Sequence, residues 1–306
     1  MPIAVFGSIN IDLTAYAERL PRPGETLHGE RYALGLGGKG CNQAVAARRL
    51  GAPTTLIGRT GDDAFGARVR ADLEAMEVST KDVFVDPESD TGIAVIGVDA
   101  DAQNCITVIG GANLAIDEGD VTRAADRLAH SDTLLLQMEI PLEPALMAAD
   151  LVRKSGGRVI LDPAPAPRNG YAPGVLSRID VITPNETETE LLTGTKPENA
   201  SEAEEAAGKL RAQGVAAAVV KLGAVGVYFQ DADGDGFVEP FKVDSIDSVA
   251  AGDCFNGGLA VALSEGKPLA EAVRFAAACG ALSTTKRGAS SSAPTRDEVE
   301  ALLARG

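Results

Sequence analysis

The sequence contains no tryptophan, only two histidines and only four cysteines. A catalytic triad of the serine-protease kind and a multi-histidine metal centre both need histidine, and neither His28 nor His130 lies in a suggestive setting. The cysteines are far apart and form no Cys-x-x-Cys pair, which favours a reducing compartment and argues against a zinc site. If the protein is an enzyme, its chemistry must depend on carboxylates, lysine and glycine backbone.

Long apolar runs and basic residues are also scarce. No run approaches the roughly 20 residues that cross a bilayer. The start, MPIAVFGSINID, lacks a basic region and reaches Asp12 too early for a signal peptide, so we expect a cytoplasmic protein with no membrane partner. The 28 Lys and Arg residues against 44 Asp and Glu give a net charge of −16, which argues against nucleic-acid binding because phosphate contacts need a basic face.

The hydrophobic residues, 45% of the chain, occur in short β-prone runs that alternate with amphipathic stretches. In residues 133–165, for example, TLLLQMEI and RVILDPAP predict strands, and the intervening PLEPALMAADLVRKSG predicts a helix. This alternation predicts an α/β fold with a three-layer α/β/α core and a mostly parallel central sheet. Ligands of such sheets bind beyond the carboxyl ends of the strands. Polar clusters follow the predicted strands there: SINID, QMEI, DPAP, TPNETE and KLGAVG.

Two segments interrupt the alternation. Residues 13–34 are extended and punctuated by proline and glycine, and residues 91–113 have the pattern of a β-hairpin. We expect residues 13–34 and 91–110 to form a small β-sheet lid, inserted in a catalytic core made of residues 1–12, 35–90 and 111–306. An exposed apolar sheet of this kind would cover a ligand and offer a dimer surface.

Two glycine-rich or acidic stretches resemble known motifs without fulfilling them. GLGGKG (35–40) matches G-x-G-x-x-G but does not directly follow a strand, and Gly40 stands where a Walker A loop has Ser or Thr. DADGDGFVEPFK (231–242) begins like an EF-hand loop but has Lys242 in place of the final glutamate. A polar turn between two strands is the better interpretation of this second stretch.

The stretch VAAGDCFNGG (249–258) has the properties of an anion site. A helix N-terminus offers unpaired N–H groups, and the small residues Ala250, Ala251 and Gly252 would let a phosphate approach them. Asp253 in the first turn would face the group that attacks that phosphate, as phosphoryl transfer requires. The alternative is that Asp253 only caps its helix.

The sequence resembles the ribokinases of the PfkB carbohydrate-kinase family over essentially the whole chain, because this stretch and the family's other motifs occur in the same order along it. The motifs are GSINIDL (7–13), GGKGCNQAVAA (37–47), TGDDAFG (60–66), QMEIP (137–141), DPAPA (162–166), TPNETE (183–188), LGAVGV (222–227), DSVAAGDCFNG (247–257) and KRGASSSAP (286–294). The resemblance implies a ribokinase-like fold and ATP-dependent phosphorylation of D-ribose at O5 to D-ribose 5-phosphate. It makes Asp253 the general base and the amides of Ala250, Ala251 and Gly252 the anion hole, with Gly252 permitting the tight turn.

The resemblance also implies the remaining ligands. For the sugar these are Asn10, Asp12, Gly38, Lys39, Asn42, Glu139 and Asp253. For ATP they are Asn185, Lys221, Gly223, Gly226 and Gly252, with Glu188 holding Mg²⁺ through water. For a potassium ion they are Asp247, Val249, Ser283, Gly288 and Ser292. Carboxylates and amides suit a ring of sugar hydroxyls, and Asn and Glu oxygens suit a hydrated Mg²⁺.

Several alternatives stay open. Asn10 and Asp12 could make only turn bonds, Lys39 could be solvated, and Asn185 could be a helix cap. Three residues depart from the usual pattern of the family, because Lys221 replaces a small hydroxyl residue, Asp162 an asparagine and Cys254 a threonine.

The substrate is open too. Other substrates within the family are 2-deoxyribose, fructose, a keto-deoxy sugar acid or a nucleoside, and a non-catalytic sugar-binding regulator is the alternative from a different class. An NAD-dependent dehydrogenase is excluded, since the acid that binds its ribose is missing. The resemblance further implies a homodimer formed through the lid.

Overall fold

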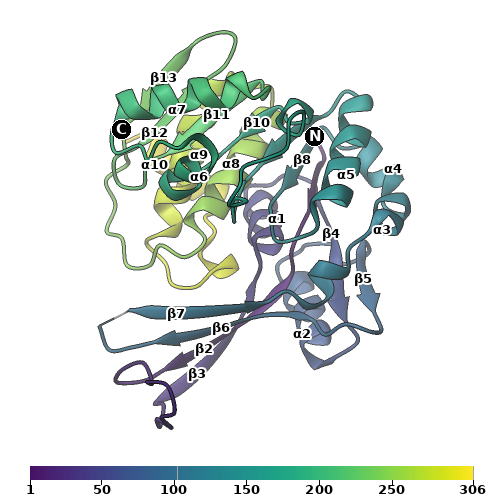
Figure 1. Ribbon diagram of the computed structural model, residues 1–306, viewed down its shortest axis with the longest axis vertical. Helices are drawn as coiled ribbons and strands as arrows, with labels where there is room; N and C mark the ends of the chain where they lie inside the picture. The colour runs from purple at the N-terminus through teal and green to yellow at the C-terminus, as the bar shows by residue number, and fades with distance from the viewer. Residues whose placement is uncertain (102, 306) are drawn as a thin grey trace.

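The computed structural model describes residues 1–101 and 103–305, and this part of the chain contains two β-sheets (Figure 1). The larger sheet has nine strands in the order β13-β12-β11-β10-β9-β8-β1-β4-β5. They are β1 (Ile3–Phe6), β4 (Thr54–Gly61), β5 (Val83–Asp86), β8 (Thr133–Leu136), β9 (Arg158–Leu161), β10 (Val181–Ile182), β11 (Ala217–Lys221), β12 (Val227–Gln230) and β13 (Asp235–Val238). In the described part of the chain, the antiparallel pairs of this sheet are β11–β12 and β12–β13, and the other pairs are parallel, which confirms the mostly parallel sheet. The turn between β12 and β13 confirms the interpretation of residues 231–242.

Helices cover both faces of this sheet. They are α1 (Lys39–Arg49), α2 (Ala64–Ala75), α3 (Glu118–Arg123), α4 (Ala125–Ala129), α5 (Leu142–Lys154), α6 (Glu186–Thr193), α7 (Ala200–Ala212), α8 (Ala251–Ser264), α9 (Leu269–Ser283) and α10 (Arg296–Leu303), with 3₁₀ turns at Gly111–Ala115, Leu176–Arg178 and Ser290–Ser292. None of the helices in the described residues is both long and apolar enough to cross a membrane.

Strand β1 shows how the three layers form. Its sequence, IAVF, is apolar throughout because both of its faces are buried. Ile3 and Val5 pack in one core cluster with α1, α8 and α9, whereas Ala4 and Phe6 pack in a second cluster with α5 and α7. Alternate residues of one strand therefore enter opposite cores, which confirms the predicted α/β/α sandwich.

The order of the strands determines where a ligand can bind. Strand β1 lies between β4 and β8 and is parallel to both. The chain first proceeds outward from β1 through β4 and β5, and then returns to β8 on the other side of β1. The carboxyl ends of β1 and β8 therefore flank a topological switch point, the place where open α/β sheets bind their ligands. The segments beginning at Gly7 and Gln137 leave the sheet there.

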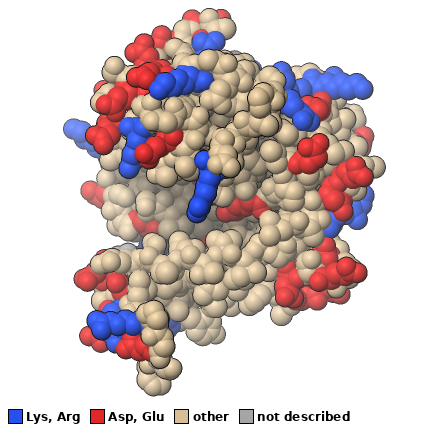
Figure 2. Space-filling view, in the orientation of Figure 1, with Lys and Arg blue, Asp and Glu red and all other residues tan. Residues whose placement is uncertain are grey.

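The smaller sheet projects from the core beside this switch point (Figure 1). It has the strand order β3-β2-β6-β7 and is made of β2 (Asn10–Tyr16), β3 (Arg31–Gly37), β6 (Gly92–Val98) and β7 (Asn104–Ile109). Strands β6 and β7 are antiparallel, as expected for a hairpin. Figure 2 shows that the molecule is hollowed between this small sheet and the core, and that charged side chains of both signs border the hollow.

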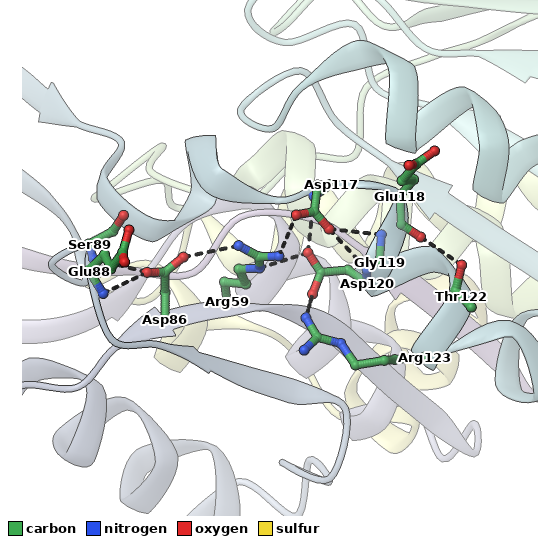
Figure 3. Close-up of polar contacts among 10 residues, drawn as sticks. All are labelled: Arg59, Asp86, Glu88, Ser89, Asp117, Glu118, Gly119, Asp120, Thr122 and Arg123. Carbon is green, nitrogen blue, oxygen red and sulfur yellow. Dashed lines mark hydrogen bonds and ion pairs between the residues drawn. The ribbon is translucent and has the colours of Figure 1, made fainter.

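A partly buried ionic network links β4, β5 and the start of α3 (Figure 3). Arg59 of β4 contacts Asp86 of β5 at 3.0 Å, Asp117 at 3.1 Å and Asp120 at 2.7 Å. Asp117 and Asp120 also form the capping box at the N-terminus of α3, and Asp120 pairs with Arg123. Because Asp120 is fully buried, these cations compensate a charge that would otherwise be costly.

Candidate active site

The N-terminus of α8 forms one wall of a polar cavity of about 170 Å³. The cavity is lined by Lys39, Asp162, Ala164, Asn185, Glu188, Lys221, Ser248, Ala250, Ala251, Gly252 and Asp253. The sharp turn into the helix lies at Ala250, whose φ of 59° is in the left-handed region. The resemblance implied a tight turn at Gly252, which is wrong because Gly252 lies within α8 and does not have a positive φ. Strain at a non-glycine residue of this kind is often found at functional sites.

Asp253 is buried and held by two amides. Asn42 donates to its Oδ2 at 2.8 Å and Gln43 donates to its Oδ1 at 3.1 Å, both from α1. Burial raises the pKa of Asp253, the nearby Lys39 lowers it, and Asp162 raises it again, so the net direction is upward. A carboxylate with a raised pKa accepts a proton more readily than an ordinary aspartate, as a general base must.

Gln43 connects this carboxylate to a second one. Its Nε2 also donates to Asp162 at 3.0 Å, and its Oε1 accepts from Gln137 at 2.7 Å, which fixes the orientation of the amide. Asp162 in turn lies 3.4 Å from the ammonium group of Lys221. Neither Gln43 nor Gln137 was predicted as a site residue, although they lie in the motifs GGKGCNQAVAA and QMEIP.

The glycine-rich loop before α1 packs closely on the segment that follows β1. Gly38 has a φ of 86°, and a Cβ there would lie 2.8 Å from the backbone nitrogen of Asn10, so this position requires glycine. Next to it, the amide of Lys39 donates to Oε2 of Glu139 at 3.2 Å, and Ser8 donates to the same oxygen at 2.5 Å. Glu139 is thus fixed across the switch point. Ser8 is a further contact that sequence analysis missed.

Asn10 and Asp12 lie at the start of the inner strand β2, where the chain leaves the core and enters the small sheet. The Oδ1 of Asn10 accepts from Asn113 at 2.8 Å, a fixed contact rather than a local turn bond. The carboxylate of Asp12 lies against Gly37, where a Cβ would come within 2.0 Å of Oδ1. Burial, together with the charges of Glu139 and Asp253, raises the pKa of Asp12 to about 6.

The site carries more negative than positive charge. Five carboxylates lie in or near the cavity, and they belong to Asp12, Glu139, Asp162, Glu188 and Asp253. The ammonium groups there are the two of Lys39 and Lys221. Burial lowers the pKa of Lys39, but four carboxylates, Asp253 foremost, outweigh this effect and raise it above its usual range. An anionic ligand such as a nucleotide therefore needs a cation with it to enter this cavity.

Asn185 and Glu188 occupy the wall opposite α8. Asn185 caps α6 in a capping box with Glu188, so the helix-cap alternative from the sequence is confirmed. Both oxygens of Glu188 accept bonds from Asn185, and burial raises its pKa. Among the described residues no group of three or more acidic, Cys or His side chains could hold a metal ion. The carboxylate oxygens of Glu188 keep free lone pairs, and oxygen donors of this kind suit a hydrated Mg²⁺.

The residues predicted for a monovalent cation lie beyond the start of α8. The carboxylate of Asp247 accepts from the amides of Val249 at 3.0 Å and Gly288 at 3.1 Å, which brings two loops together. Ser283 and Ser292 lie on either side of the thiol of Cys254, and burial raises the pKa of this thiol to about 12. The backbone amide of Asp247 also donates to Thr284, next to Ser283. The five predicted residues therefore share one region.

The sequence matches the pfkB family of carbohydrate kinases over residues 2–296. The chain belongs to this family. It is 40% identical over 297 residues to a ribokinase of Haemophilus influenzae, covering 97% of this chain and 96% of that protein. It is 35% identical over 306 residues to a deoxyribokinase of Salmonella typhi, covering 99% of both. The solved structure of Arabidopsis thaliana ribokinase complexed with ribose and ATP matches with a TM-score of 0.92 at 35% identity, over 99% of this chain and 98% of that one.

In this pfkB-family chain the loop after β11 carries Gly223 and Gly226, which are not among the residues that line the cavity. Gly223 and Gly226 have positive φ values of 50° and 136° in the turn between β11 and β12. A Cβ on Gly226 would lie 2.5 Å from the carbonyl of Val238, so the turn requires glycine for its own packing. Lys221 precedes this turn and lines the cavity together with the residues of the α8 N-terminus.

Proposed function

We propose that the chain is a ribokinase, which transfers the γ-phosphoryl group of ATP to O5 of D-ribose and yields D-ribose 5-phosphate and ADP. The observation that carries the proposal is Asp253, a buried carboxylate with raised pKa in the first turn of α8, beside small residues whose backbone faces the same cavity. The similarity to a ribokinase complexed with ribose and ATP supports both ligands.

In this mechanism Asp253 takes the proton of the sugar hydroxyl as it attacks, while Asn42 and Gln43 hold the carboxylate in place. The amides of Ala250, Ala251 and Gly252 at the N-terminus of α8 stabilise the charge on the transferred group, and that of Ala251 must first leave the carbonyl of Ser248, to which it donates at 3.2 Å. Asn10, Asp12, Gly38, Lys39, Asn42 and Glu139 bind the sugar, and Asn185, Lys221, Gly223, Gly226 and Gly252 contact the nucleotide.

Two cations complete the proposal. Mg²⁺ supplies positive charge to the phosphates, which the acidic cavity cannot, and Asn185 and Glu188 hold it through water. A potassium ion supports the anion-hole loop, and Asp247, Val249, Ser283, Gly288 and Ser292 surround it. Activity that stays the same when potassium is replaced by a bulky organic cation would contradict the second site.

The small sheet serves as a lid in this proposal. Residues 13–34 and 91–110 close over the sugar, joined to a catalytic core of residues 1–12, 35–90 and 111–306. Closure excludes water, which otherwise competes as phosphoryl acceptor. Asp12 and Asn10 lie where the lid meets the core, so closure brings sugar ligands from both parts together.

A second copy of the chain covers the exposed edge of the lid. Strand β7, NCITVI, is exposed throughout, carries no charge and includes Ile106 and Val108, which are 52% and 54% exposed. Two copies of a chain with a net charge of −16 repel one another, so an uncharged strand such as β7 is the favourable place for them to meet. Light scattering after size exclusion should give a dimer mass, and Ile106→Glu with Val108→Glu should give a monomer. Leu191→Glu, a change at an exposed leucine of α6, should leave the mass unchanged.

The substrate test is a coupled assay of ADP release with Mg-ATP and K⁺. Ribose, 2-deoxyribose, fructose, a sugar acid and adenosine are compared, since a relative at 35% identity is a deoxyribokinase. We expect the highest kcat/KM with ribose. A higher value with 2-deoxyribose or another acceptor would keep the mechanism and change the substrate. Sugar binding without any turnover would favour a regulator instead.

Because ATP and free thiols coexist in the cytoplasm, and all four cysteines are free, we place the enzyme there.

A further inference from the structure

Asp162 and Lys221 face each other inside the cavity. Asp162 follows β9 and Lys221 ends β11, so the carboxyl ends of two strands of the core sheet bring them together. The Nζ of Lys221 lies 3.4 Å from Oδ1 of Asp162, and the two side chains are 14% and 3% exposed.

Asp162 is held firmly in this contact, whereas Lys221 is held only weakly. Charge-assisted N–H···O bonds usually measure about 2.7–2.9 Å, so 3.4 Å marks a weak bond. Asp162 is fixed by its second oxygen, which accepts from Gln43 at 3.0 Å. The side chain of Lys221 reaches the carboxylate through a flexible stem of four carbons. The ammonium group is therefore the partner that can move.

The ammonium group also lies above the N-terminus of α8. A Cβ built on Gly252 would lie 3.5 Å from Nζ of Lys221. Both residues line the cavity that contains Ala250, Ala251 and Asp253. A phosphoryl group bound at the amides of this helix would consequently lie within reach of the lysine.

We propose that Lys221 binds the γ-phosphoryl group itself, donating to a phosphoryl oxygen when the nucleotide binds, and that Asp162, which stays beside the ammonium group, positions the lysine throughout. The inference deepens the proposed function and rests on it for the identity of the transferred group. Lys221 then supplies a cation on the face of the phosphoryl group nearest Asp253, where the surrounding carboxylates otherwise oppose the incoming negative charge.

The first test measures binding and needs no sugar. Titration calorimetry with Mg²⁺ compares ADP and a non-hydrolysable ATP analogue on the wild-type chain and on Lys221→Met. A charge-assisted bond to the γ-phosphoryl group predicts that the variant loses roughly 10- to 100-fold in affinity for the analogue. Its affinity for ADP should change by less than about twofold. Lys209→Met is the matched control, because Lys209 pairs with Glu205 on the surface of α7.

The two nucleotides separate this inference from its alternatives. An equal loss for both nucleotides would place Lys221 on the α- or β-phosphate, and no loss for either would leave it a structural partner of Asp162. Both results overturn the inference, as would a wild-type chain that does not prefer the triphosphate. Because no sugar is present, a chain that phosphorylates no sugar can still pass this test.

The second test addresses Asp162 as a positioning residue. Asp162→Asn keeps the shape and the bond to Gln43 but leaves the lysine unheld. We expect kcat to fall about tenfold with little change in nucleotide affinity, a split that a merely structural role would not produce. The acid limb of kcat should also move to lower pH, because the charge of Asp162 raises the pKa of Asp253 and Lys39, which lowers it, stays in place.

A double variant completes the second test. Asp162→Asn with Lys221→Thr removes both charges, and its loss in kcat should be smaller than the product of the two single losses, since each single change leaves one charge unpaired. Purely multiplicative losses, or an unchanged kcat in Asp162→Asn, would show that the pair does not act as a unit.

Discussion

Asn42 donates a hydrogen bond of 2.8 Å from Nδ2 to Oδ2 of Asp253, across 211 residues of sequence. Its Oδ1 accepts from the hydroxyl of Ser290 at 2.6 Å, so the amide can point its nitrogen in only one direction. The resemblance implied a sugar ligand at Asn42. In the structure one of its two amide hydrogens is committed to the carboxylate, which leaves the other for a sugar hydroxyl.

Asn42→Ala should therefore alter the pH dependence of the reaction. The bond from Asn42 favours the ionised form of Asp253, so its loss should raise the pKa of that carboxylate further. The acid limb of the kcat profile should then move to higher pH. Asn199→Ala, which removes the cap of α7, serves as control. A limb that does not move would mean that Asn42 binds only the sugar.

Asp253→Asn should lower kcat by about 10²–10⁴-fold, the usual contribution of a general base. The change keeps the size of the side chain, so sugar and nucleotide should still bind, as calorimetry can check. Its new amide would face the donors of Asn42 or Gln43, which adds a local cost in stability. An exposed aspartate of the turn before β13 provides the control, Asp233→Asn. Rates within tenfold of wild type would remove Asp253 from the mechanism.

The sequence predicted the core because the core follows local rules. Runs such as IAVF and TLLL are apolar on both faces only when helices cover both faces of a sheet. The polar residues that follow these strands marked the ligand-binding edge for the same reason. The three small residues before Asp253 marked the helix N-terminus.

Other parts of the site depend on long-range proximity, which no local pattern encodes. Gln43 lies among alanines in α1, and its role appears only when residues 94, 119 and 210 positions away surround it. Ser8 contacts Glu139 only because β1 and β8 are neighbours. The left-handed turn at Ala250 also escaped prediction, because alanine has no preference for that conformation.

Asp12→Asn should stabilise the empty protein while it impairs sugar use. Burial raises the pKa of Asp12 from 3.8 to about 6, so between these values the folded state keeps a proton that the unfolded chain releases. Stability therefore falls as pH rises through this window and stays lower above it. Two pKa units correspond to about 3 kcal/mol, an upper bound for the gain in Asp12→Asn at pH 7.5.

The measurement is urea unfolding of the empty protein at pH 4 and pH 7.5, together with kcat/KM for the sugar. The stabilisation should be present at pH 7.5 and nearly absent at pH 4, whereas kcat/KM should fall roughly 10- to 100-fold with the lost charge-assisted bond. Asp233→Asn should change neither quantity. Equal stability of Asp12→Asn and wild type at pH 7.5 would show that burying the charged carboxylate of Asp12 does not destabilise the folded protein.

Arg59→Leu should destabilise the fold without touching the cavity. The change removes the guanidinium that Asp86, Asp117 and Asp120 share, and it leaves the fully buried Asp120 with only Arg123 as a cation (Figure 3). Breaking a buried ion pair by removing one partner costs about 3–5 kcal/mol. We expect about 3 kcal/mol here, measured by urea unfolding.

The control for this change is Arg68→Leu, which breaks an exposed pair with Asp72 one helical turn away on α2. Such pairs contribute only about 0.3–0.5 kcal/mol, so the two arginines should differ several-fold in their effect. Comparable losses at both positions would mean that water reaches Asp120 and solvates it. The kcat of folded Arg59→Leu should stay near that of wild type, because the network supports β4, β5 and α3 rather than the residues around Asp253.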